Sequence, residues 1–251
     1  MRPRPSILHP IRMNTSSELL VPFEHLSEAT FYYPCSGRDW ADPMRIFGPW
    51  VRHVRFVDPN HRCRLIVNRG QLLHQNFPDW KFLSRTTEGA PEAPRPGYCG
   101  PNLERDLPDY QSSVVSELYR HLPTDREVSV HFHRGDGRKT LELLEDPIGV
   151  FFHRGDTGPS DDPGEGSSGS HWLSKEWLQP VLDRMIDGGF VVTDGSCGIE
   201  YPELNRRGDI KTHEEAIASG KEFTSDGIHF RCVGFAGMRN GPTLIWQIRK
   251  N

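Results

Sequence analysis

The chain has 251 residues, and its 30 Lys and Arg against 34 Asp and Glu leave a formal net charge of −4. This near balance argues against a strongly basic protein that binds nucleic acid generally. We expect the partner to be a small-molecule or nucleoside-type ligand, because polar side chains gather where such ligands bind in open sheets. No run of apolar residues approaches the length of a membrane helix, so we expect no membrane association. Five scattered cysteines and the lack of a secretory pattern predict a cytoplasmic protein.

The first half of the chain predicts strands separated by turns and short helices. Asp42-Pro43 is typical of a helix start, and Gly48-Pro49 ends the short helix that follows. Ser112–His121 carries apolar residues at 114, 115, 118 and 122, which is helical spacing. The strands predicted by β-branched, aromatic or alternating residues are Ala29–Tyr33, Val54–Val57 and Glu127–Phe132, with possible strands at Leu65–Val67 and Trp80–Ser84.

The second half of the chain predicts clearer elements. The apolar run Ile148–Phe152 indicates a strand buried on both faces. Apolar residues from Trp177 to Ile186 recur at helical spacing, and Gly188-Gly189 then marks the end of the helix. The other elements predicted here are helices at Thr140–Leu144 and Thr212–Ser219, a strand at Phe190–Thr193, and a hairpin of Ile228–Phe235 with Thr243–Ile248 around Asn240-Gly241.

Helices that alternate with strands predict the α/β class, with a mostly parallel twisted sheet, helices on both faces and a C-terminal antiparallel hairpin. We predict an N-terminal arm over residues 1–28 and a single α/β domain over 29–251. The stretch around 64–111 is rich in Pro and Gly, so we interpret it as an irregular insertion.

Polar side chains follow each predicted parallel strand. In open α/β sheets, ligands bind beyond the carboxyl ends of the strands, so these side chains are candidates for one site. The alternative is that loops between strands and helices are polar anyway. The candidates are Ser36, Gly37 and Asp39; Asp58; His133, Arg134 and Asp136; His153, Arg154 and Asp156; and Asp194 and Ser196.

Asp58 is a candidate for a ribose contact. It follows Gly37 by 21 residues and comes directly after an apolar strand, a spacing at which nucleoside-binding sheets place an acid on the ribose hydroxyls. A capping role before Pro59 is the alternative.

Two segments share the pattern Phe-His-Arg-Gly-Asp, at 132–136 and 152–156, and we interpret them as neighbouring strands that end in the same turn. His131 and His133 lie on one face of the first strand, and His153 is a candidate neighbour. This set could suit a transition metal, but its spacing fits no zinc pattern, so we predict no metal site.

The order of elements resembles that of class I S-adenosylmethionine-dependent methyltransferases. Leu182–Val192 looks like the family's helix, Gly-Gly and strand, and Ile228–Arg249 looks like its closing hairpin. The resemblance implies that S-adenosylmethionine lies over Pro34, Ser36, Gly37 and Asp39, with Asp58 on its ribose. It also implies a catalytic loop at His153, Arg154 and Asp156. We predict substrate contacts from the remaining candidates, which are His133, Arg134, Asp136, Asp194 and Ser196.

The function expected from these residues is methyl transfer from S-adenosylmethionine to an unspecified acceptor. Two alternatives stay open. One is a non-catalytic binding or regulatory protein of the same fold. The other is a hydrolase of nucleotide-like substrates, in which His and Asp act on the substrate and Arg134 and Arg154 grip its phosphate.

Overall fold

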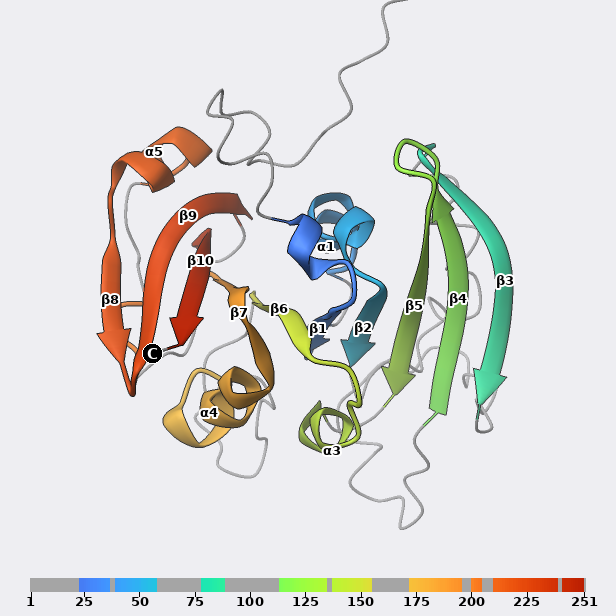
Figure 1. Ribbon diagram of the computed structural model, residues 1–251, viewed down its shortest axis with the longest axis horizontal. Coiled ribbons are helices and arrows are strands. Elements are labelled where there is room, and N and C mark those ends of the chain that lie inside the picture. The colour runs from blue at the N-terminus through green and yellow to red at the C-terminus, as the bar shows by residue number, and fades with distance from the viewer. Residues whose placement is uncertain are drawn as a thin grey trace, which may run out of the picture.

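A computed structural model describes residues 23–36, 39–57, 78–88, 113–134, 137–154, 172–195, 200–204, 210–238 and 241–250. Within them, ten strands form one sheet in the order β3-β4-β5-β2-β1-β6-β7-β10-β9-β8 (Figure 1). The strands are β1 Thr30–Pro34, β2 His53–Val57, β3 Trp80–Glu88, β4 Ser113–His121, β5 Arg126–Arg134, β6 Ile148–His153, β7 Met185–Thr193, β8 Glu222–Ser225, β9 Ile228–Met238 and β10 Pro242–Lys250.

The described helices are few and short. The longest, α4, has ten residues and contains Pro180, while the other three α-helices have six residues each. The α-helices are α1 Ala41–Ile46, α3 Gly137–Glu142, α4 Lys175–Arg184 and α5 His213–Ala218, and the 3-10 turns are η3 Glu24–Leu26 and η4 Gly48–Trp50. About half of the described residues lie in strands, so strand pairing satisfies more of the backbone than the helices do.

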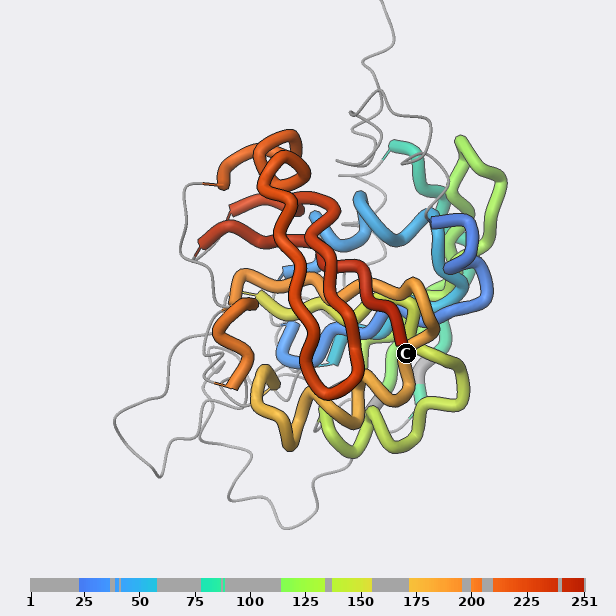
Figure 2. The backbone as a smooth tube through the Cα atoms, turned by 60° about the vertical axis from the view of Figure 1, so that its left-hand side comes forward, coloured from blue at the N-terminus to red at the C-terminus, as the bar shows by residue number. Residues whose placement is uncertain are grey.

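The sheet is parallel at its centre and antiparallel at both ends. The strands β5, β2, β1, β6 and β7 pair in parallel. Antiparallel pairing adds β4 and β3 beyond β5, and it adds β10, β9 and β8 beyond β7. Figure 2 shows the β8, β9 and β10 strands running side by side.

The predicted fold class is wrong. The sheet is not mostly parallel, because five of the nine pairings between described strands are antiparallel. Strands dominate, and short helices take the place of the expected helical layers on both faces. The resemblance to class I methyltransferases is wrong for the same reason, because this strand-dominated mixed sheet is not that family's fold.

Part of the error lies in residues 113–121, which form strand β4 where helical spacing predicted a helix. The buried side chains are Val115, Glu117, Tyr119 and His121, which alternate as a strand requires. Two of these four are polar, so the apolar residues alone showed a misleading period. A second correction concerns the helix predicted to reach Ile186: α4 ends at Arg184, and Met185 already pairs with Ile148 in the sheet.

Other predicted elements are confirmed. Strands β1, β2, β5 and β6 lie where β-branched and aromatic residues predicted them, and β3 begins at Trp80. Helix α5 begins with a capping box, in which Thr212 Oγ1 accepts from the Glu215 N–H at 3.1 Å. The C-terminal hairpin pairs β9 with β10 in antiparallel register from Pro242↔Met238 to Lys250↔Ile228. The arm, the insertion and the possible strand Leu65–Val67 lie largely outside the described residues, so the domain division stays a prediction.

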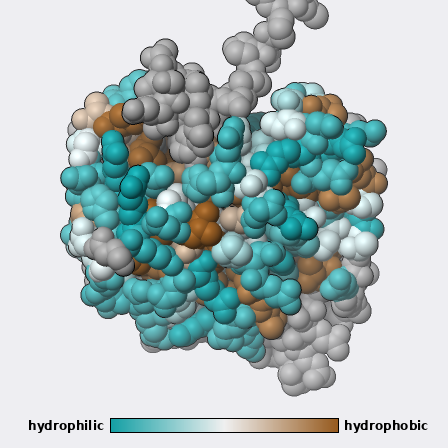
Figure 3. All heavy atoms as spheres, viewed as in Figure 1, coloured by the Kyte–Doolittle hydropathy of each residue, from teal (hydrophilic) through white to brown (hydrophobic). Residues whose placement is uncertain are grey.

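Two hydrophobic clusters cover the two faces of the sheet. Phe31, Phe56 and Phe152 belong to one cluster, together with side chains from α1 and η4. Tyr32, Phe151 and Trp246 belong to the other, together with side chains from α3 and α4. Alternate residues of the central strands thus enter opposite clusters, as expected of strands buried on both faces. The surface seen in Figure 3 is mainly hydrophilic, with scattered hydrophobic side chains.

Candidate functional site

The carboxyl ends of the parallel strands meet at one edge of the sheet. At the centre of this edge, β1 lies between β2 and β6, so the chain proceeds to one side after β1 and returns to the other side at β6. This β1–β6 junction is the switch point in strand order, where open sheets bind ligands. Strand β9 is antiparallel to β10, which is antiparallel to β7, so β9 also ends at this edge.

The structure describes about half of the candidate residues. Pro34 ends β1 and His153 ends β6, and Ser36, Asp39, Arg154 and Asp194 lie in the segments just beyond the strands. His133 lies in β5, whose Arg134 is described for its backbone alone. Gly37, Asp58, Asp136, Asp156 and Ser196 lie outside the described residues. The roles assigned to all these residues stay predictions.

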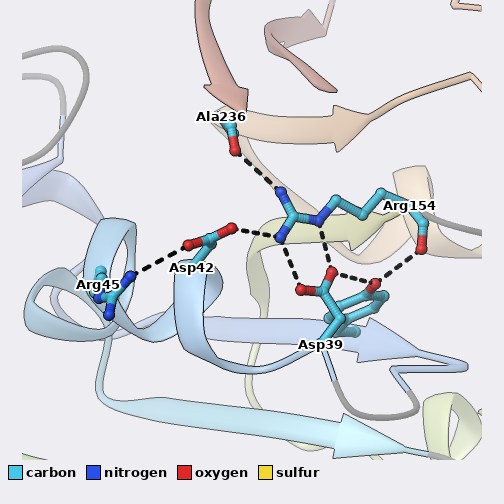
Figure 4. A network of polar contacts seen from close by, with 6 residues as sticks. Asp39, Asp42, Arg45, Arg154 and Ala236 are labelled. Atoms are coloured by element: carbon cyan, nitrogen blue, oxygen red, sulfur yellow. Dashed lines mark hydrogen bonds and ion pairs between the residues drawn. The ribbon is translucent and has the colours of Figure 1, made fainter. Parts of the chain in front are cut away.

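Arg154 and Asp39 form the centre of a buried network at the β1–β6 junction (Figure 4). The guanidinium donates from Nε to Asp39 Oδ2 at 2.6 Å and from Nη2 to Asp39 Oδ1 at 2.7 Å. Nη2 also donates to Asp42 Oδ2 at 2.7 Å, and Nη1 donates to the Ala236 carbonyl at 3.1 Å. The Tyr33 hydroxyl lies 2.9 Å from both Asp39 Oδ2 and the Arg154 carbonyl oxygen. The network therefore links β1, α1, β6 and β9.

The electrostatics of the network favour the charged guanidinium. Burial opposes the charge, but the hydrogen bonds and negative charges of Asp39 and Asp42 outweigh burial and raise the pKa of Arg154. The Arg154 side chain is 4% exposed, and the Asp39 side chain is 10% exposed. Because its donors already face carboxylates and a carbonyl, Arg154 holds the junction together, and gripping a substrate phosphate would require breaking these pairs.

His153 and Asp194 lie on adjacent strand ends, and both are buried. His153 pairs with Thr193 in the β6–β7 register, and its Nδ1 lies 3.5 Å from Thr193 Oγ1. That oxygen also accepts from the Gly195 N–H at 2.9 Å. At the end of β1, the Ser36 N–H donates to the Val57 carbonyl at 3.0 Å, and the preceding Cys35 has φ +55°, a left-handed conformation that few non-glycine residues adopt. The junction is thus a tightly bonded turn.

The two Phe-His-Arg-Gly-Asp segments do not lie on neighbouring strands. They end β5 and β6, which are separated by β2 and β1 in the sheet. His131 and His133 instead face β2, where they contact His53 and Arg55. Sequence reasoning missed these two partners, because the predicted strands Val54–Val57 and Glu127–Phe132 stop short of His53 and His133, which the structure includes in β2 and β5. Within the described residues, no three His, Cys, Asp or Glu side chains are arranged to hold a metal ion.

The comparisons with known proteins supply no relative. Neither a protein-family model, nor a curated protein, nor a solved structure matches the chain. Among the described helices, none has the length and apolar character needed to span a bilayer.

Proposed function

We propose that the protein binds a nucleoside-type small molecule at the β1–β6 junction. The observation that carries this proposal is the switch in strand order, which brings the segments after β1, β6 and β7 to one edge of the sheet. These segments carry Ser36 and Asp194, whose hydroxyl and carboxylate oxygens are suited to the hydroxyl and amine hydrogens of a nucleoside.

S-adenosylmethionine is the proposed ligand, and methyl transfer is the proposed reaction. In this proposal the Arg154–Asp39 pair positions the loop after β1 against the end of β6, and His153 is the candidate base for an acceptor that needs one. Binding without turnover is the second candidate. The occupied donors of Arg154 disfavour the phosphate hydrolase, because they are already paired with Asp39 and Asp42.

Isothermal titration of the purified protein with S-adenosylmethionine, its demethylated product and adenosine tests the proposal. Asp194→Asn alters the proposed edge, and Asp187→Asn makes the same change at the exposed, opposite end of β7. We expect saturable binding by the wild type, a loss of about tenfold or more in Asp194→Asn, and unchanged affinity in Asp187→Asn. No binding of any of the three compounds, or an equal loss in both variants, would overturn the proposal. Transfer of a labelled methyl group then separates an enzyme from a binding protein.

A further inference from the structure

The side chains of His53, Arg55, His131 and His133 form a cluster on one face of β2 and β5, which we term the His/Arg cluster. Within each strand the two residues are two positions apart, so they project to the same side of the sheet. The parallel register pairs Arg55 with His131. Arg55 Nη1 lies 3.2 Å from His133 Nε2, and His53 Nδ1 lies 3.4 Å from His131 Nε2.

The histidines of this cluster are neutral at neutral pH. Burial, followed by the charge of Arg55, lowers the pKa of His131 to about 3 and that of His133 to about 4. Burial also lowers the pKa of His53, against the opposing charge of Asp146. His131 Nδ1 lies 2.8 Å from Ser116 Oγ, and His53 Nε2 lies 3.6 Å from Asp146 Oδ2. These contacts therefore position the rings, while burial keeps them neutral.

Arg55 carries the charge of the cluster, and within the described residues that charge lacks a matching partner. Among the described residues, no carboxylate forms an ion pair with it, and its one hydrogen-bonded side chain is the neutral His133. Its Nε is buried and makes no hydrogen bond within the described part of the chain. Asp146 and Glu145 act on it only through longer-range charge, and burial lowers its pKa. Arg55 as a whole is half-buried, and a guanidinium withdrawn from water in this way is costly unless an anion compensates it.

We propose that the His/Arg cluster binds a phosphate-type oxyanion, either free or as part of a larger ligand. A guanidinium whose Nε bonds no described residue matches two oxygens of such an anion, and the negative charge of the bound anion would favour protonation of the imidazoles beside it. The site lies on the face of β2 and β5 and not at the β1–β6 junction, so it is independent of the proposed nucleoside site.

Calorimetric titration with inorganic phosphate, adenosine monophosphate and adenosine tests this site. Arg55→Gln removes the unpaired charge, while Arg52→Gln removes a charge from an arginine whose side chain is 61% exposed and pairs with Glu28. We expect wild-type binding of phosphate to weaken by about tenfold or more in Arg55→Gln and by less than about twofold in Arg52→Gln. Binding of adenosine monophosphate that is tighter than that of both phosphate and adenosine, and that weakens in Arg55→Gln, would assign the anion to a nucleotide. Equal binding of the monophosphate and of phosphate would assign it to free phosphate.

Thermal unfolding with and without phosphate provides a second measurement of binding and shows whether the variant is folded. In phosphate-free buffer we expect Arg55→Gln to unfold at a temperature equal to or higher than that of the wild type, because it removes an uncompensated charge. Added phosphate should raise the unfolding temperature of the wild type but not that of the variant. If Arg55→Gln does not fold, His131→Gln takes its place in the titration. The proposal is overturned if the wild type does not bind phosphate, or if Arg52→Gln loses as much affinity as the cluster variant.

Discussion

At the scale of single residues, the Arg154 guanidinium shows how burial determines what a charged group does. Its side chain and that of Asp39 are almost fully buried, whereas the Asp42 side chain that shares the guanidinium is 45% exposed. The three side chains belong to one network. If Arg154 is removed, water can solvate the exposed Asp42 carboxylate but not the buried Asp39 carboxylate. The two carboxylates should therefore differ strongly in their effect on stability.

Arg154→Ala tests this difference. It leaves the Asp39 carboxylate buried without its two guanidinium bonds, so we expect unfolding to become easier by about 3–5 kcal/mol. Asp42→Asn keeps the Asp39 pair and should cost about 1 kcal/mol or less. Arg45→Ala, which removes the other cation at Asp42, is the matched surface control. Urea unfolding measures all three, and equal losses in Arg154→Ala and Asp42→Asn would contradict the assignment.

At the scale of elements, helix α5 lies against β9 through a glycine. His213 at the start of α5 is buried, and its Nδ1 accepts from the Phe235 N–H at 3.3 Å. A Cβ added at Gly234 would lie 2.6 Å from His213 Cε1 and 2.9 Å from Nδ1, closer than real side chains approach. The glycine therefore permits both the close packing and the hydrogen bond that join the helix to the sheet.

Gly234→Ala should force α5 away from β9 and cost about 1–3 kcal/mol of unfolding free energy. In a His213→Ala background, Gly234→Ala should cost much less unfolding free energy, because the imidazole that clashes with the added Cβ is absent. A double-mutant cycle followed by chemical unfolding measures this coupling. An additive double mutant would show that the helix does not depend on this contact.

At the scale of the whole molecule, the His/Arg cluster makes folding dependent on pH. Burial, followed by the charge of Arg55, holds the folded pKa values of His131 and His133 at about 3 and about 4. In the unfolded chain the pKa of both histidines returns to about 6.5. At pH values between the folded and unfolded pKa values, the unfolded state therefore binds more protons than the folded state. Their contribution to stability is present above about pH 6.5 and is lost as the pH falls toward 4 and then 3.

We therefore expect the free energy of unfolding to decrease between pH 7 and pH 4 in phosphate-free buffer, by on the order of 2 kcal/mol for each histidine. His131→Gln should flatten this decrease, since glutamine does not titrate. His229→Gln is the control, because its ring is half-buried on β9, away from the cluster. Equilibrium unfolding at several pH values measures the slopes. An unchanged slope in His131→Gln would contradict the predicted burial of its neutral ring.

The packing of β4 in the sheet explains why the sequence predicted the wrong fold class. Buried Glu117 accepts from Arg85 Nε at 2.9 Å and from the Tyr119 hydroxyl at 2.5 Å, so a charged residue occupies a core position of β4. Hydrophobic spacing could not reveal this position, because the arginine that compensates it comes from β3, 32 residues earlier. Because β4 was predicted to be a helix, the antiparallel pairing of β3, β4 and β5 at this end of the sheet could not be predicted.

The sequence by itself determined the local elements whose side chains carry their own pattern. The apolar run of β6, the capping box of α5 and the Asn240-Gly241 hairpin all depend on residues close together in the chain. Only the tertiary structure decided the strand order, the antiparallel ends and the partners of Arg154 and Arg55. These depend on pairings such as Arg154 with Asp39, 115 residues apart, and on burial, which sets the strength of each charge.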